Sequence, residues 1–186
     1  MYCNKTLRGY LDDLAARLPA PGGGSAAALT ASEAAALVSM VINFTIGKPK
    51  YAKYERQLKE MLERSEGLRN EFLRLVDLDV AAYDSKNLRD CLDVPFMVCR
   101  LCFEGIKLCP QLIARSNQNL VSDVAVAAIL FEAAFASAYF NVEINLKAIA
   151  DKKFERPVRK ELLRKAAGIK KVRAEMEDKV VKAIRG

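Results

Sequence analysis

A helix of small, uncharged residues behind three consecutive glycines constrains the fold of this chain more than any other feature. Gly22, Gly23 and Gly24 precede Ser25, a residue type that favours the N-cap of a helix. After Ser25, Glu33 is the only charged residue for more than twenty positions. One face of this helix carries small or polar residues at helical spacing: Ser25, Ser32, Ala36, Ser39 and Asn43. We therefore expect a largely buried helix that runs to about residue 46 and packs closely against a neighbouring helix.

The glycine triplet also makes the first turn of this helix a candidate ligand site. Glycine has no Cβ, so another group can approach the backbone, and free N–H groups of a first turn bind anions or carbonyl oxygens. The glycine spacings of P-loops and of dinucleotide-binding folds are absent, and no strand precedes the triplet. Taken alone, the triplet favours a plain loop before a core helix.

The remaining segments also show helical periodicity, and no run alternates in the way that a strand does. We expect further helices over about 7–18, 51–87, 95–115, 122–150 and 157–184, the first with a stripe of leucines. A chain of 186 residues is long enough to bury a core of its own. We predict an all-α fold, an antiparallel multi-helix bundle that forms one domain over residues 1–186.

Composition excludes several kinds of chemistry. The chain has no histidine, which excludes a Ser-His-Asp triad, a Cys-His pair and His-ligated zinc. Its five cysteines, an odd number without a preceding signal peptide, predict free thiols in a reducing cytoplasm. Cys99 and Cys102 have the spacing of a metal or redox pair, but their apolar helix face favours buried thiols. The apolar run over 124–142 contains Glu132 and many alanines, so we interpret it as a buried helix rather than a membrane span.

The net charge of +7 is concentrated at the C-terminal end of the chain. Residues 151–186 hold 13 Lys or Arg and 6 Asp or Glu, a balance of +7, so the rest of the chain is neutral. A basic helix of this kind usually has a solvated face, but it also attracts an anionic partner or the acidic tail of a substrate. Nucleic-acid binding is the weaker hypothesis, because the helix has no interleaved aromatic residues and no recognised motif.

Asp79 lies on the apolar stripe of the helix expected over 51–87. Its neighbours one turn away are apolar, among them Val76 and Ala82. A carboxylate that faces a core is costly unless it is paired, and burial raises its pKa, which is how a general base near neutral pH arises. A buried aspartate that is hydrogen-bonded for structural reasons explains the pattern equally well. Asp77 is rotated to the opposite side and is expected to be solvated.

The helix expected over 122–150 repeats this pattern of polar groups on one narrow arc: Asp123, Ala127, Leu130, Ala134, Ser137, Asn141 and Asn145. Asp123 and Asn141 are about 27 Å apart at ~1.5 Å per residue, so they cannot contact the same atom of a small ligand. They suit two ends of an extended ligand, or two sites in an oligomer. The two asparagines alone favour helix–helix hydrogen bonds, and the turn with Lys48 and Tyr51 is in itself merely exposed and basic.

Four motifs occur in order over nearly the whole chain. They are P-A-P-G-G-G-S-A-A-A (19–28), N-F-T-I-G-K-P-K-Y (43–51), D-V-A-A-Y (79–83) and S-D-V-A-V-A-A (122–128), the last continuing into Y-F-N-V-E-I-N-L-K (139–147). Together they resemble the cyclodeaminase/cyclohydrolase family. That family includes the cyclodeaminase domain of formimidoyltransferase-cyclodeaminase and the stand-alone methenyltetrahydrofolate cyclohydrolases. The D-V-A-A-Y motif matches the family segment that carries its proposed catalytic aspartate.

The resemblance implies an all-helical protein that dimerises, binds folate at a subunit interface, and uses no metal and no cofactor beyond a tetrahydrofolate substrate. A homodimer is also expected because the small-residue helix faces exceed what one small bundle can bury. The candidate catalytic residues are Asp79 and Asp123. The candidates for substrate binding are Gly22, Gly23, Gly24, Ser25, Asn43, Lys48, Tyr51, Ser122, Asn141 and Asn145.

One departure from the family pattern bears on the substrate pocket. Family members usually have a longer insertion between the helix of Asp79 and the next helix, whereas residues 84–93 alone fill that place here. The predicted function is that of a folate one-carbon enzyme, either a methenyltetrahydrofolate cyclohydrolase or a formiminotetrahydrofolate cyclodeaminase, with an aspartate base. The alternative is a helical binding or scaffold protein that has kept the fold without the chemistry.

Overall fold

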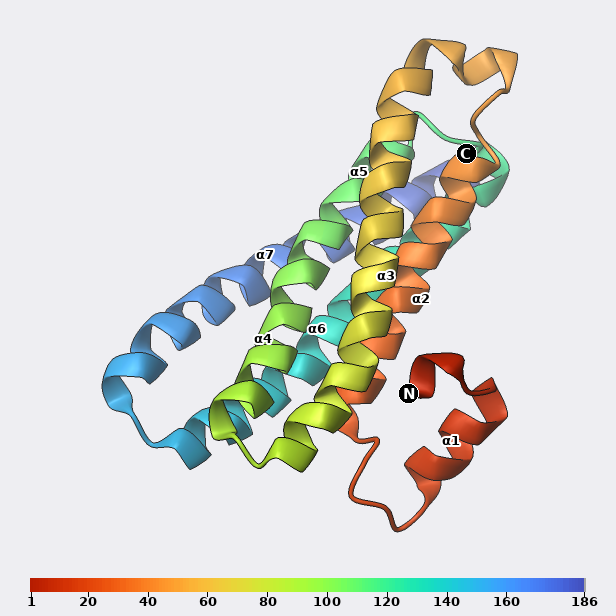
Figure 1. The fold of residues 1–186 in the computed structure, drawn as a ribbon. Coiled ribbons are helices and arrows are strands. Elements are labelled where there is room, and N and C mark those ends of the chain that lie inside the picture. Colours follow the sequence, from red (N-terminus) through yellow and green to blue (C-terminus); the bar gives the residue numbers. More distant parts are fainter. Residues whose placement is uncertain (186) are drawn as a thin grey trace.

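The computed structural model describes residues 1–185, and every regular element in this range is helical. Figure 1 shows long helices packed side by side, with the N-terminal segment at one side of the bundle. The α-helices are α1 (Leu7–Ala15), α2 (Gly23–Asn43), α3 (Glu55–Ser85), α4 (Leu88–Gly105), α5 (Cys109–Leu112), α6 (Val121–Ile149) and α7 (Lys152–Arg185). Short 3-10 helices cover Tyr2–Asn4, Pro49–Tyr54, Ile106–Leu108 and Gln118–Leu120. The all-α prediction is confirmed.

Helix α2 packs against both α3 and α6, and its small residues allow this close packing. Its alanines that are fully buried are Ala28, Ala31, Ala34 and Ala35. On the predicted small face, the Ser32 hydroxyl donates to the carbonyl oxygen of Arg69 on α3 at 3.2 Å. The hydroxyl oxygens of Ser39 and Ser65 lie 2.8 Å apart. The small face therefore packs against a neighbouring helix, as the sequence predicts, and the hydroxyls of Ser32 and Ser39 are paired across the contact with α3.

Both ends of α2 differ from the sequence prediction. The helix begins at Gly23, and Gly22 occupies the N-cap position in an extended conformation, so Ser25 is not the cap. Ser25 instead lies within the first turn. The helix ends at Asn43 rather than near residue 46, and the buried Thr45 side chain then accepts a hydrogen bond from the backbone N–H of Asn117. This bond fixes the C-terminal end of α2 to the segment that leads into α6.

The helix that follows α3 begins earlier than the sequence predicts. Lys86 adopts a left-handed conformation that ends α3, and the side chain of Asn87 accepts the N–H of Arg89 at the start of α4. Pro95, the predicted start, lies inside α4. A proline leaves the carbonyl four residues earlier without its helical donor. The Asn145 side chain on α6 donates to that carbonyl, of Cys91, at 2.6 Å, which explains why the proline is tolerated.

Three other predicted boundaries were also wrong. A 3-10 helix opened by Pro49 delays the start of α3 to Glu55. The helix predicted over 95–115 ends at Gly105, and a 3-10 turn and α5 continue the chain. Helix α7 begins at Lys152 rather than Pro157, because the Asp151 carboxylate accepts the N–H groups of Lys153 and Phe154 at 3.1 and 3.2 Å. A side-chain cap therefore sets the start of α7, whereas Pro49 opens a separate 3-10 helix before α3.

Helix α1 lies beside the first turns of α2, outside the packed bundle (Figure 1). Its leucine stripe does not form a buried face, because Leu7, Leu11 and Leu18 are all exposed. Tyr10 is the buried residue of α1, and Leu14, one turn further along the same side, is half-buried against the core. Only one edge of the leucine stripe is therefore buried, since α1 is short and lies at the periphery of the bundle.

Candidate functional site

The carboxylate of Asp79 lies against the first turn of α2. The backbone N–H of Ser25 donates to its Oδ2 at 2.8 Å. A Cβ placed on Gly24 would lie 2.1 Å from Oδ1, so only glycine leaves room for the carboxylate at this point. The glycine triplet and the aspartate thus belong to one arrangement, in which a helix N-terminus holds a carboxylate.

The surroundings of Asp79 suit a proton acceptor. Burial raises the pKa of its carboxyl group, and the hydrogen bond from the Ser25 N–H lowers it in part. Within residues 1–185, only Oδ2 accepts a hydrogen bond. A half-buried carboxylate with a raised pKa and one uncommitted oxygen accepts a proton more readily than an exposed aspartate does.

The two predicted asparagines lie at this same end of the bundle. The Asn141 side chain is 3.5 Å from the position that a Cβ on Gly23 would occupy, and it donates to the Ser137 carbonyl of its own helix at 3.0 Å. Asn145 donates to the Cys91 carbonyl on α4, so it makes the helix–helix hydrogen bond that the spacing favoured. Gly22 has open space around it. Asn141 thus remains beside the glycines as a candidate ligand contact.

The other predicted site residues lie at the opposite end of α2. They are Asn43, Lys48, Tyr51, Ser122 and Asp123, from the end of α2, the turn after it and the start of α6. Tyr51 is buried, Asp123 is half-buried, and Asn43, Lys48 and Ser122 are exposed. Helix α2 has 21 residues, which is about 30 Å at ~1.5 Å per residue. A single chain therefore does not bring Asp123 or Lys48 to Asp79.

Asp77 does not have the solvated side chain that the sequence predicts. It is half-buried, and its carboxylate accepts the backbone N–H groups of Tyr2 and Cys3. The N-terminal 3-10 helix folds back over this part of α3 and covers the residue. Helical periodicity in α3 could not reveal this contact, because the partner lies 75 residues away in sequence.

The cysteines do not form a reactive pair. Burial raises the pKa of Cys99 to about 12 and that of Cys102 well above its usual value. Both thiols are therefore protonated and unreactive at neutral pH. Among residues 1–185, no group of three or more Cys, Asp or Glu side chains is placed to hold a metal ion. The prediction of buried, free thiols is confirmed.

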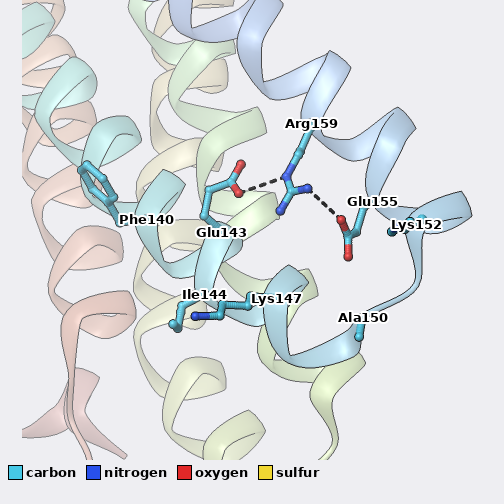
Figure 2. Close-up of a pocket in the computed structure, with 8 residues that line it drawn as sticks. All are labelled: Phe140, Glu143, Ile144, Lys147, Ala150, Lys152, Glu155 and Arg159. Carbon is cyan, nitrogen blue, oxygen red and sulfur yellow. Dashed lines mark hydrogen bonds and ion pairs between the residues drawn. The ribbon is translucent and has the colours of Figure 1, made fainter.

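A pocket of about 580 Å³ lies between α6 and α7, and Asp79 is not among its residues (Figure 2). Its lining residues are Phe140, Glu143, Ile144, Lys147, Ala150, Lys152, Glu155 and Arg159. Figure 2 shows the Arg159 guanidinium between two carboxylates, and it donates to Glu143 at 3.0 Å and to Glu155 at 2.7 Å. Phe140 and Ile144 are 73% and 61% exposed. The pocket is thus partly charged and partly apolar.

The structure adds Tyr10 to the residues near Asp79. Its hydroxyl group lies 3.3 Å from Oγ of Ser25, the residue whose N–H holds Asp79. The sequence offers one signal for it, a tyrosine among leucines in a short helix, and that signal does not distinguish a buried side chain from an exposed one.

Comparison with known proteins identifies a family. The family model described as formiminotransferase-cyclodeaminase matches residues 6–86 and 85–164. The two matches meet at the turn between α3 and α4, where the sequence predicts that this chain is shorter than other members. A methenyltetrahydrofolate cyclohydrolase of Methylorubrum extorquens is 40% identical, with 86% of this chain and 88% of that protein covered.

More distant similarities agree with this family. The formimidoyltransferase-cyclodeaminase of Mus musculus is 29% identical over 81% of this chain, which spans 32% of that longer protein. The crystal structure of a formiminotetrahydrofolate cyclodeaminase from Thermotoga maritima superposes with a TM-score of 0.92 and 29% identity. It covers 97% of this chain and 98% of the other.

Proposed function

Because this chain belongs to the formiminotransferase-cyclodeaminase family and is a folate one-carbon enzyme, we propose that it hydrolyses 5,10-methenyltetrahydrofolate to 10-formyltetrahydrofolate. The observation that carries this choice is the 40% identity to a methenyltetrahydrofolate cyclohydrolase over 88% of that protein. The cyclodeaminase reaction is the second candidate, and it is favoured by the superposition on a formiminotetrahydrofolate cyclodeaminase.

In the proposed reaction Asp79 acts as the general base. It removes a proton from a water molecule, whose oxygen attacks the methenyl carbon between N5 and N10. The bond from this carbon to N5 then breaks, N5 keeps the electron pair and takes up the other proton of the water, and the formyl group stays on N10; the proton removed by Asp79 is the one released overall. In the cyclodeaminase reaction N10 attacks the formimino carbon and ammonia leaves, so the same carboxylate would transfer protons at the same carbon. Its raised pKa and its uncommitted Oδ1 support both roles.

We propose that a second copy of the chain completes the folate site. Residues expected to bind one extended substrate are divided between two ends of α2 that are about 30 Å apart. In a two-fold dimer, the end with Asp79 and Asn141 can face the end with Lys48 and Asp123 of the other copy. Helix α6 also has exposed apolar residues that recur at helical spacing: Val126, Ile129, Phe140 and Ile144. These residues support a homodimer with α6 at its interface.

The proposal requires no metal and no cofactor beyond the folate, and it places the enzyme in the cytoplasm.

Helix α2 and the segment Gln118–Ile149 are long and apolar enough to cross a membrane by length and composition alone. The bundle buries 61% of the first apolar stretch but only 44% of the second. Contact with a second copy accounts for the apolar surface that the single chain leaves exposed on α6.

The basic face of α7 is a candidate binding surface for the acidic tail of a polyglutamylated folate.

An absorbance assay of methenyltetrahydrofolate tests the proposed reaction. The purified protein should accelerate loss of the methenyl absorbance, and a separate assay with 5-formiminotetrahydrofolate detects formation of the same chromophore. We expect Asp79→Asn to lower turnover by roughly 10²-fold or more, the usual scale for a lost general base. The control is Asp84→Asn, which removes an exposed carboxylate from the same helix.

The outcomes separate the possible functions. Turnover in the second assay alone would assign the cyclodeaminase reaction. Folate binding without turnover in either assay would favour the scaffold alternative. Equal losses from Asp79→Asn and Asp84→Asn would show a general charge effect and remove Asp79 as the base.

A further inference from the structure

The N-terminal segment places one buried hydroxyl group next to Ser25, the residue that holds the candidate base. Tyr10 is 4% exposed, whereas Leu7 and Leu11 on the same helix are exposed. Its hydroxyl oxygen lies 3.3 Å from Oγ of Ser25, which is fully buried. The N–H of Ser25 donates to Oδ2 of Asp79 at 2.8 Å. Ser25 therefore contacts Tyr10 with its side chain and Asp79 with its backbone.

Tyr10 is uncharged at neutral pH, so it acts on its surroundings through its hydroxyl group rather than through a charge. Burial raises the pKa of Tyr10 on α1 and of Cys91 on α4, and the charge of Asp79 raises both further. Helix α2 contributes the Ser25 N–H, and α6 contributes the uncharged amide of Asn141 beside Gly23. With both titratable neighbours protonated at neutral pH, the Asp79 carboxylate depends on neutral polar groups for its stabilisation.

We propose that Tyr10 is a positioning residue for Asp79. Its hydroxyl group fixes the Ser25 side chain and thereby the first turn of α2, whose N–H holds the carboxylate. Removal of this hydroxyl group leaves the buried Ser25 Oγ without its partner. A buried polar atom without a hydrogen bond is unfavourable, so we expect Ser25 and its N–H to reorient. The inference rests on the proposed role of Asp79 as the base, and it concerns a residue that contacts Asp79 only through Ser25.

The same segment provides a matched control. Tyr2 donates its hydroxyl proton to the Ala20 carbonyl at 3.4 Å, and its ring contacts the Tyr10 ring edge to face, with centroids 5.7 Å apart. Both Tyr10→Phe and Tyr2→Phe thus remove one hydroxyl hydrogen bond from the N-terminal segment and keep the ring. Only the first of these bonds reaches Ser25.

Carbon-13 NMR titration of the Asp79 carboxyl group tests the proposal without relying on activity. In Tyr10→Phe we expect the Asp79 midpoint to move to higher pH, because the ionised carboxylate loses polar stabilisation. Tyr2→Phe should leave the midpoint where it is in the wild type. In the cyclohydrolase assay, Tyr10→Phe should lower kcat by about 10-fold with little change in KM, as expected when a catalytic group is misplaced and binding is kept.

Ser25→Ala provides the second arm, because it removes the other half of the bond and keeps the N–H. It should shift the Asp79 midpoint in the same direction, and the double variant Tyr10→Phe/Ser25→Ala should shift it no further. An unchanged or lowered Asp79 midpoint in Tyr10→Phe, with only a lower Tm, would overturn the proposal. A wild-type protein without turnover would refute the proposed function, while the titration would still decide the role of Tyr10.

Discussion

At the scale of single residues, the most informative group is a carboxylate that the fold holds in an unfavourable place. Asp79 is half-buried, and the Ser25 N–H is its only hydrogen-bond donor in residues 1–185. Burial raises the pKa of this carboxyl group, so its charged form destabilises the folded chain relative to the unfolded one. Proteins tolerate such strain at sites where a reactive group is needed.

This strain predicts an effect of pH on stability. Because the folded pKa is raised, the penalty is absent below the unfolded pKa near 4, develops as the pH rises, and is complete above the folded pKa. Asp79→Asn removes the charge and keeps an oxygen that accepts the Ser25 N–H. We therefore expect its Tm to exceed that of the wild type at pH 7, with the difference shrinking toward pH 4. A Tm below the wild-type value at pH 7 would show instead that the charged carboxylate stabilises the fold.

The sequence predicts that Asp79 faces the core, but it does not predict the groups that surround it. Its place on the apolar stripe of α3 follows from the 3.6-residue period, and the stripe is confirmed by buried residues such as Leu75, Val76 and Ala82. The prediction that Asp77 is solvated was wrong, because its hydrogen-bond partners come from the N-terminal 3-10 helix. Tyr10 was missed for the same reason. Periodicity describes one helix, whereas these contacts join distant parts of the chain.

At the scale of helices, the glycine triplet has a different role at each position. A Cβ on Gly22 would meet open space, and one on Gly23 would make an ordinary contact of 3.5 Å with the Asn141 side chain. A Cβ on Gly24 would lie 2.1 Å from Asp79 Oδ1. The sequence predicts that these glycines permit a close approach, and the structure identifies a side chain of the same protein as the group that approaches.

The difference between neighbouring glycines yields a paired prediction. Glycine to alanine inside a helix usually stabilises it by about 0.8–1 kcal/mol, so Gly23→Ala should leave Tm unchanged or raise it. Gly24→Ala forces the Asp79 carboxylate away from the Ser25 N–H, and we expect a loss of about 1–3 kcal/mol from the broken buried hydrogen bond. Thermal unfolding of both variants measures the contrast. Equal Tm values would show that Asp79 moves aside without loss.

Helix ends were less predictable than helix faces. The prolines at 95 and 157 suggested starts that lie inside α4 and α7. The actual starts depend on Asn87 and Asp151, whose side chains accept N–H groups of the first turn. Pro95 fits within α4 because Asn145, on another helix, donates to the Cys91 carbonyl. A compensation of this kind becomes visible only when the two helices are placed together.

At the scale of the whole molecule, the proposed folate site requires more than one chain. The predicted binding residues form two groups at opposite ends of α2, and neither group alone contains both Asp79 and Lys48. The exposed apolar residues of α6 give an independent reason to expect a partner copy. A homodimer through α6 would cover this surface and supply the second group of residues to each site.

A pair of isoleucines tests this assembly. Ile144 on α6 and Ile184 on α7 are 61% and 63% exposed, so aspartate at either place costs a single chain little. A charge at residue 144 would be buried in the proposed interface, whereas residue 184 lies outside the proposed α6 contact. In sedimentation experiments at micromolar concentration, we expect the wild type and Ile184→Asp to have twice the 20.6 kDa mass of one chain. Ile144→Asp should shift toward a single chain and lose cyclohydrolase turnover with it, because each site lacks its second group of residues. A wild type that sediments as one chain and is fully active would refute both the dimer and the shared site.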